Sequence, residues 1–127
     1  MILDANVIIA LLNGTDVHHQ EAVEIIAEAT GDLLVPELTL AEALVHHVRA
    51  GTAEDALVVL RELGLETLSG PSPLVLAELR VETRLRMPDC VVLGAAEQSG
   101  QPLVTFDEQL ARAAEGRGVR TSRDPGR

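Results

Sequence analysis

The chain has 127 residues, 46% of them hydrophobic, which is enough to bury one core, so we expect a single ordered domain over residues 1–127. Its 20 acidic residues outnumber its 10 basic residues, all of them arginine, and the net charge of −10 disfavours generic binding to nucleic acid. The absence of lysine excludes P-loop, Schiff-base and receiver-domain chemistry, and a single aromatic residue, Phe106, disfavours a module that stacks bases on aromatic side chains.

The N-terminal residues give no sign of export or of a membrane anchor. They are apolar but include Asp4 and Asn6 and no basic leader, which is unlike a signal peptide, and they fall short of the ~18 apolar residues of a membrane span. The lone Cys90 cannot form an internal disulfide. We therefore expect a cytoplasmic protein without a membrane partner.

Short apolar runs alternate with helical patterns along the first half of the chain. The expected elements are strands at 1–4, 33–35 and 65–68, and helices at 5–12, 17–29, 38–50 and 53–63. The last two helices stop at Gly51 and Gly64, because glycine commonly follows the end of a helix.

The second half continues the alternation. The expected elements are helices at 74–85, 89–97 and 107–114, and strands at 102–106 and 118–120. Residues 91–96 are apolar on every side of their helix, which predicts that this helix is buried. Residues 121–127 are expected to form a frayed tail. Strands and helices in alternation predict an α/β fold with a parallel sheet.

Four acidic residues fall near one edge of this expected sheet. Asp4 closes the first strand, Glu42 lies in the helix after the second, Asp89 opens the buried helix, and Asp107 follows the fourth strand. In an open parallel sheet, ligands bind outside the carboxyl ends of the strands. The four side chains therefore form a candidate site.

Three of these acids also have an ordinary structural interpretation. Asp4 can cap the first helix, and Asp89 suits the first turn of a helix, where a negative charge interacts favourably with the helix dipole. Asp107 lies inside a capping-box pattern in which Thr105 is the cap and Glu108 reaches back.

Glu42 is harder to explain as a structural residue. At ~100° per residue it shares a side of its helix with Leu38, Ala41 and Val45, which we interpret as the buried stripe. A buried acid needs a partner, either an arginine or a metal ion, and the first half of the chain has only Arg49 and Arg61.

Carboxylates gathered at one edge repel one another, and a divalent cation would relieve that repulsion. A ligand set made only of oxygen favours a hard ion over zinc. The adjacent pairs at 18–19 and 46–47 are histidines that point in different directions on a helix, so we expect them to be exposed rather than ligands. Cys90 is expected to be a small core residue.

Four segments together carry a resemblance to a known family. They are Asp4-Ala5-Asn6, Leu38-Thr39-Leu40-Ala41-Glu42, Met87-Pro88-Asp89 and Thr105-Phe106-Asp107. In this order and spacing, from residue 2 to about 120, the chain resembles the PIN-domain ribonucleases, and in particular the VapC-type toxins of bacterial toxin–antitoxin pairs.

The resemblance implies a central parallel sheet of about five strands flanked by helices, and hydrolysis of RNA supported by Mg²⁺ or Mn²⁺. It also implies that Asp4, Glu42, Asp89 and Asp107 are the catalytic and metal-binding residues, and that Asn6 and Thr105 support them. A cognate antitoxin that covers the site and a homodimer are implied as well.

Three arginines, Arg80, Arg84 and Arg86, precede Asp89 and are candidates for contact with RNA phosphates. The alternative is a solvated helix face in which they pair with Glu78 and Glu82.

Two other functions stay open at this point. One is another carboxylate–metal phosphohydrolase, although such enzymes usually show Asp-x-Asp where this chain has Asp4-Ala5-Asn6. The other is a PIN-like binding or scaffolding module without catalysis, in which we would expect acids to be missing.

Overall fold

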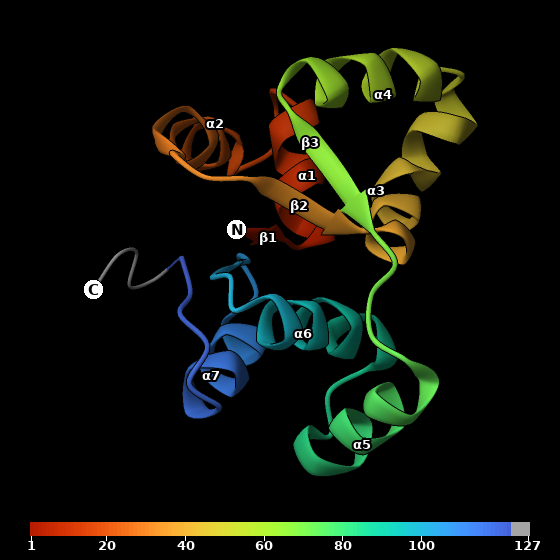
Figure 1. Cartoon of the computed structure of the whole chain (residues 1–127). Helices are drawn as coiled ribbons and strands as arrows, with labels where there is room; N and C mark the ends of the chain where they lie inside the picture. Colours follow the sequence, from red (N-terminus) through yellow and green to blue (C-terminus); the bar gives the residue numbers. More distant parts are fainter. Residues whose placement is uncertain (123–127) are drawn as a thin grey trace.

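A parallel sheet forms the centre of the molecule (Figure 1). The structure is a computed structural model and describes residues 1–122. The strands are β1 (Ile2–Leu3), β2 (Leu33–Pro36), β3 (Leu65–Leu68) and β4 (Leu103–Val104), in the order β3-β2-β1-β4, and each neighbouring pair is parallel. The helices of the described part are α1 (Ala5–Leu12), α2 (His19–Glu28), α3 (Glu37–Ala50), α4 (Ala53–Glu62), α5 (Pro73–Thr83), α6 (Met87–Ser99) and α7 (Glu108–Gly116).

The predicted α/β class is confirmed, and the described residues 1–122 contain four strands where about five were expected. Within them, a single parallel bridge joins Leu103 to Thr121 in place of a strand at 118–120. The Leu103 N–H donates to the Arg120 carbonyl oxygen over 2.8 Å, and the Ser122 N–H donates to the Leu103 carbonyl oxygen over 3.1 Å.

The C-terminal end of the described part is held against the sheet. Thr121 is 1% exposed, and the Ser122 hydroxyl donates to the carbonyl oxygen of Thr105 over 3.1 Å. Thr121 and Ser122 thus belong to the folded body, and the rest of the expected frayed tail, residues 123–127, lies outside the described residues.

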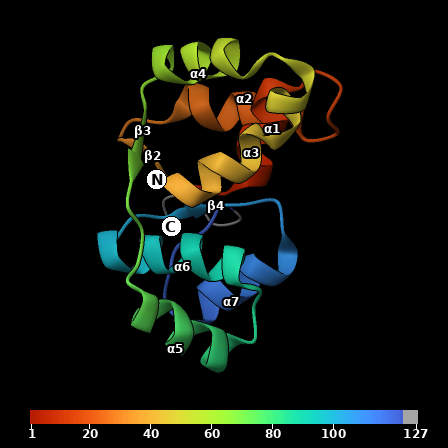
Figure 2. The ribbon, with the colours of Figure 1, turned by 90° about the vertical axis from the view of Figure 1, so that its right-hand side faces the viewer.

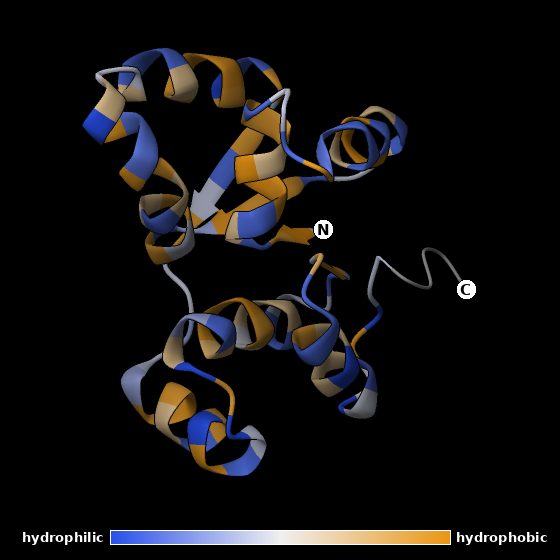
Figure 3. Cartoon of the chain, turned by 180° about the vertical axis from the view of Figure 1, so that it is seen from behind, coloured by the Kyte–Doolittle hydropathy of each residue, from blue (hydrophilic) through white to orange (hydrophobic). Residues whose placement is uncertain are grey.

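Helices lie on both sides of the sheet (Figure 2). Two hydrophobic clusters fill the spaces between the sheet and these helices. Successive residues of a strand point to opposite faces, so Ile2 and Leu103 pack into the cluster with α5, α6 and α7, whereas Leu3 and Val104 pack into the cluster with α1, α2 and α3. β1 lies between two other strands and is hydrophobic along its length (Figure 3).

α6 is the most buried helix, as its composition predicts. Residues 90–96 are all buried, and Cys90 is a core residue, as expected. α6 contacts β1, β2 and β4, so it lies directly across the middle of the sheet. Among residues 1–122, no helix combines the length and the apolar character needed to cross a membrane.

Candidate active site

The strand order places a crevice at the carboxyl edge of the sheet. From β1 the chain runs outward through β2 to β3, whereas β4 lies on the other side of β1. Such a reversal is where open α/β sheets bind ligands. Asp4 follows β1 directly, its N–H donates to the carbonyl oxygen of Val104 over 3.0 Å, and Thr105 follows β4. The two chain segments thus meet at the crevice.

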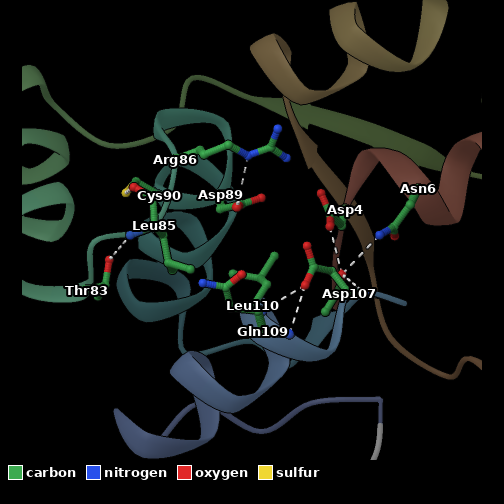
Figure 4. Close-up of polar contacts among 11 residues, drawn as sticks. Asp4, Asn6, Thr83, Leu85, Arg86, Asp89, Cys90, Asp107, Gln109 and Leu110 are labelled. Atoms are coloured by element: carbon green, nitrogen blue, oxygen red, sulfur yellow. Dashed lines mark hydrogen bonds and ion pairs between the residues drawn. The ribbon is translucent and has the colours of Figure 1, made fainter.

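Asp4 is 8% exposed and is held by two hydrogen bonds. It is the N-cap of α1, and its Oδ1 accepts from the Ala5 N–H over 2.8 Å. Its Oδ2 accepts from the Thr105 hydroxyl over 2.7 Å. The capping role proposed as an alternative is therefore real, and it leaves the same carboxyl group facing the crevice with Asp89 and Asp107 (Figure 4).

Thr105 connects two of the acidic residues. Its hydroxyl donates to Asp4 and accepts from the backbone N–H of Asp107 over 3.0 Å. Asn6 supports the same loop, because its Nδ2 donates to the Thr105 hydroxyl over 3.3 Å and its Oδ1 accepts from the Phe106 N–H over 3.2 Å. Thr105 thus contacts the carboxylate of Asp4, and Asn6 contacts the segment that leads to Asp107.

Asp107, rather than Thr105, caps α7. Its Oδ1 accepts from the N–H groups of Gln109 and Leu110, over 2.9 and 3.1 Å. The capping-box interpretation is therefore wrong about which residue is the cap. One carboxylate oxygen of Asp107 is fixed by the helix terminus, and the group faces the crevice between α6 and α1 (Figure 4).

Asp89 lies in the first turn of α6 and reaches the crevice from the opposite side. The Arg86 side chain is its neighbour, with Nε 3.9 Å from Oδ2. Arg86 is itself 81% exposed, so this ion pair leaves Asp89 only partly neutralised.

Glu42 does not lie on the buried stripe of its helix, and that interpretation is wrong. The buried side of α3 contains Thr39 and Ala43, whereas Glu42 and its neighbours Leu38 and Val45 are exposed. Glu42 is nevertheless close to the crevice. Partial desolvation raises the pKa of Glu42, the charge of Asp89 raises it further, and the charge of Arg86 lowers it.

We call Asp4, Glu42, Asp89 and Asp107 the acidic cluster. Burial raises the pKa of Asp4 to about 6, opposed by its hydrogen bonds to Thr105 and Ala5 and increased by Asp89 and Asp107. Desolvation raises the pKa of Asp89, Asp107 raises it further, and Arg86 lowers it. The members of the cluster therefore lie close enough for their negative charges to repel one another.

The donor set of the acidic cluster fits a hard divalent cation by its chemistry, since every ligand atom is a carboxylate oxygen. In their present rotamers, however, no three Asp, Glu, His or Cys side chains of residues 1–122 are close enough together to hold a metal ion. The residues thus match such an ion in kind and in charge, and binding would require the carboxylates to rotate toward one another.

The three candidate arginines are exposed. Arg80 lies in the last turn of α5, and Arg84 is its C-cap with a left-handed backbone, φ 61°. Glu82, the partner suggested by the alternative, pairs with Arg117 instead, over 2.9 Å. Arg80 and Arg84 form no ion pair within the described part of the chain.

One feature beside the site does not follow from the sequence pattern. His18 was expected to be exposed, but it is half-buried and stacked on Phe106, with ring centroids 4.4 Å apart and planes 12° apart. His19 is also half-buried, and its Nδ1 lies 2.8 Å from the carbonyl oxygen of Ala10. The one available signal was that the only aromatic residue of the chain directly precedes Asp107.

The PIN domain family model matches residues 1–116 of the chain. Comparison with curated protein sequences gives no significant match.

Several solved structures share this fold. PAE2754 from Pyrobaculum aerophilum is 24% identical, with a TM-score of 0.63, and the match covers 96% of this chain and 90% of that one. A chain of a toxin–antitoxin complex from Klebsiella pneumoniae is 20% identical, with a TM-score of 0.71 and coverage of 87% and 88%. The sarcin-ricin loop cleaving toxin VapC20 from Mycobacterium tuberculosis is 18% identical, with a TM-score of 0.74 and coverage of 88% and 93%. At these identities the likeness is one of fold.

Proposed function

Because the chain belongs to the PIN domain family, we propose that it is a metal-dependent ribonuclease that hydrolyses phosphodiester bonds in RNA. The observation that carries this proposal is the convergence of Asp4, Asp89 and Asp107 at the carboxyl edge of the sheet (Figure 4), with Glu42 in electrostatic contact with Asp89. A scaffolding module would not need to keep four mutually repelling acids together.

The acidic cluster would hold the Mg²⁺ or Mn²⁺ ion. When bound, such an ion supplies a more acidic water and stabilises negative charge on the phosphate. The residues of this chain supply the rest: the Thr105 hydroxyl orients Asp4, the N-terminus of α7 orients Asp107, and Arg86 lies beside Asp89. Arg80, Arg84 and Arg86 are the candidates for holding RNA phosphates next to the cluster.

Cleavage of a structured RNA by the purified protein tests the proposal. We expect cleavage with Mg²⁺ or Mn²⁺, none with EDTA, and a loss of at least 100-fold in Asp89→Asn, in line with removal of one electrostatic contribution of ~3 kcal/mol. Glu66→Gln on β3, an exposed carboxylate outside the cluster, is the matched control and should cut like the wild type. Equal cleavage by wild type and a folded Asp89→Asn would identify a contaminating nuclease.

Metal binding is tested separately. Calorimetric titration with Mn²⁺ should show binding to the wild type and near-loss in the double variant Asp4→Asn with Asp89→Asn. Binding that is the same in both proteins would place the ion elsewhere.

We further propose that the protein is a toxin, with a cognate antitoxin that covers the acidic cluster and with a homodimeric form. The fold likeness to chains of toxin–antitoxin complexes supports the first part. Large apolar side chains exposed on two helices support partner contacts; they are Leu38, Val45 and Val48 on α3, and Leu74 and Val81 on α5. Expression without a partner should arrest growth, and sedimentation of the purified chain should give the dimer mass. Expression that leaves growth unchanged would contradict the toxin proposal, and a monomer mass would contradict the homodimer.

A further inference from the structure

The stacked pair of His18 and Phe106 lines a pocket next to Asp107. The pocket has a volume of about 170 Å³, and the carboxylates of Glu21, Asp107 and Glu108 are also part of its lining. Thr105 positions the carboxylate of Asp4, and Asp107 is itself a member of the cluster. The pocket therefore adjoins the acidic cluster at Asp107.

The pair is held in place from several sides. Phe106 is fixed through its backbone, whose N–H donates to the Asn6 side chain, and its ring packs against the core cluster on the α1–α3 face of the sheet. The His18 N–H donates to the carboxylate of Asp16 over 2.8 Å, and its Nδ1 lies 3.6 Å from the carboxylate of Glu21. His18 itself makes no side-chain capping bond to α2.

The His18 ring has a free side. Phe106 covers one face of the imidazole, and yet 44% of the His18 side chain is exposed. Part of the side-chain surface that Phe106 does not cover is therefore accessible to solvent. A flat, solvent-facing ring backed by a second aromatic ring is the arrangement on which a nucleobase stacks.

Base stacking at this position also answers a problem of charge. With a net charge of −10, the protein repels RNA on balance, so affinity must come from interactions other than phosphate neutralisation. Stacking does not depend on phosphate charge and tolerates any base.

We propose that His18, backed by Phe106, is a positioning residue on which one nucleobase of the RNA stacks, next to the phosphodiester group that is cleaved at the acidic cluster. This inference rests on the proposed ribonuclease function and names the feature of the substrate that the site recognises: an unpaired base adjacent to the cleaved bond.

The test uses the absence of tryptophan from the chain. In an Asp89→Asn background, which we expect to bind RNA without cutting it, His18→Trp introduces one fluorophore at the platform. Val17→Trp, at an adjacent position that is 89% exposed, is the matched control. We expect a single-stranded oligoribonucleotide to quench His18→Trp and leave Val17→Trp unchanged. An abasic oligomer of the same length, which keeps the phosphates, should quench neither.

Affinity and kinetics give a second readout. His18→Ala should weaken binding of the oligomer about 5- to 150-fold, the range for removal of one stacked base, without changing the dependence on salt, because the same phosphates stay neutralised. His18→Phe should restore the affinity, which a purely structural role of the imidazole would not predict. In the cleaving protein, His18→Ala should raise KM more than it lowers kcat.

The outcomes separate the two proposals. If the wild type cuts RNA but His18→Trp is not quenched and His18→Ala binds normally, the stacking proposal is overturned and the ribonuclease stands. Equal quenching by the abasic oligomer would also overturn it, because the interaction would then be with the backbone. If the wild type neither binds nor cuts RNA, both proposals fail together.

Discussion

The carboxyl group of Asp4 is held in a position where its negative charge is unfavourable. Burial and the nearby carboxylates of Asp89 and Asp107 raise its pKa from 3.8 to about 6, although Thr105 and the Ala5 N–H both donate to it. The hydrogen bonds therefore orient the group without compensating its desolvation. Residues kept in such positions are often functional, and this is the residue-scale support for the proposed site.

The first prediction concerns the pH dependence of stability without metal. Because the pKa of Asp4 is higher in the folded protein, its proton stabilises the fold fully below about pH 3.8, and this contribution is lost as the pH rises through about 6. This rise in pKa corresponds to a contribution of at most about 3 kcal/mol to the free energy of unfolding. Asp4→Asn should therefore be more stable than the wild type at pH 7 and lose this advantage near pH 4.

The measurement is chemical denaturation of both proteins across that pH range in EDTA. Asparagine preserves a helix cap, but its amide replaces one acceptor oxygen by a donor. The gain in stability of Asp4→Asn at pH 7 should therefore be smaller than the upper bound given by the pKa. Glu66→Gln, which removes one exposed charge, is the control and should stay close to the wild type. A wild type more stable than Asp4→Asn at pH 7 would contradict the prediction.

Two buried threonines give a second prediction. The Thr39 hydroxyl is buried and has no hydrogen-bond partner within residues 1–122, and an unsatisfied polar group costs about 1–3 kcal/mol. Thr39→Val should thus raise the melting temperature. Thr105→Val, at an equally buried position, should lower it, because the Asp107 N–H would lose its acceptor and Oδ2 of Asp4 would lose its donor. Thermal unfolding of the two variants decides the matter, and a lower melting temperature for Thr39→Val would show that its hydroxyl is satisfied.

At the scale of elements, α6 determines where Asp89 lies, and α5 with the segment before it packs against α6. Gly94 is a position of close approach: a Cβ placed there would be 2.5 Å from Cγ of Pro71, which precedes α5, and 3.0 Å from Cδ1 of Leu79 in α5. α5 and its connections can lie against α6 at this distance only because residue 94 has no side chain.

Gly94→Ala should therefore destabilise the protein. Overpacking costs about 1–3 kcal/mol, which exceeds the gain of about 0.5–1 kcal/mol from replacing glycine in a helix. Gly116→Ala in α7, where a Cβ meets nothing within 4 Å, is the control and should show the gain alone. Urea denaturation measures both, and equal stability of the two variants would mean that Pro71 moves aside freely.

At the scale of the whole molecule, most of the charge has the same sign as the proposed substrate, RNA. The net charge is −10, the acidic cluster is negative, and the arginines near it are few and exposed. Long-range attraction to RNA is therefore weak. Binding must rest on a few local interactions, which favours a selective ribonuclease over one that binds every RNA.

We accordingly predict a shallow dependence of RNA affinity on salt. At ~0.7 per neutralised phosphate for single strands, three arginines that each neutralise one phosphate give a slope on the order of 2–3 in log affinity against log salt. The double variant Arg80→Ala with Arg84→Ala should reduce this slope by about 0.7 for each phosphate that is no longer neutralised. The control is Arg49→Ala with Arg61→Ala, at the ends of α3 and α4, which should leave the slope unchanged.

Filter binding of the Glu42→Gln protein, which we expect to be inactive, to two unrelated RNAs across a salt series provides the measurement. A steep slope that is equal for both RNAs would show that binding is dominated by charge and is unselective.

The order of elements could be predicted from the sequence because its signals are local. Periodic apolar residues, Gly51 and Gly64 after helices, and the uniformly apolar α6 depend only on near neighbours in the chain. The positions of Asp4, Asp89 and Asp107 were predictable for the same reason, since each directly follows a strand or opens a helix whose place in an α/β sheet is known from topology.

Only the tertiary structure decided how faces and distant segments meet. Helical periodicity groups Glu42 with Leu38 and Val45 but does not say which side is covered, and packing against α1 and α6 buries Thr39 and Ala43 instead. The sequence placed the last pairing at residues 118–120, whereas the folded chain pairs with Leu103 at Thr121. The stack of His18 on Phe106 joins residues 88 positions apart, and no local pattern encodes an interaction that forms only when the whole chain has folded.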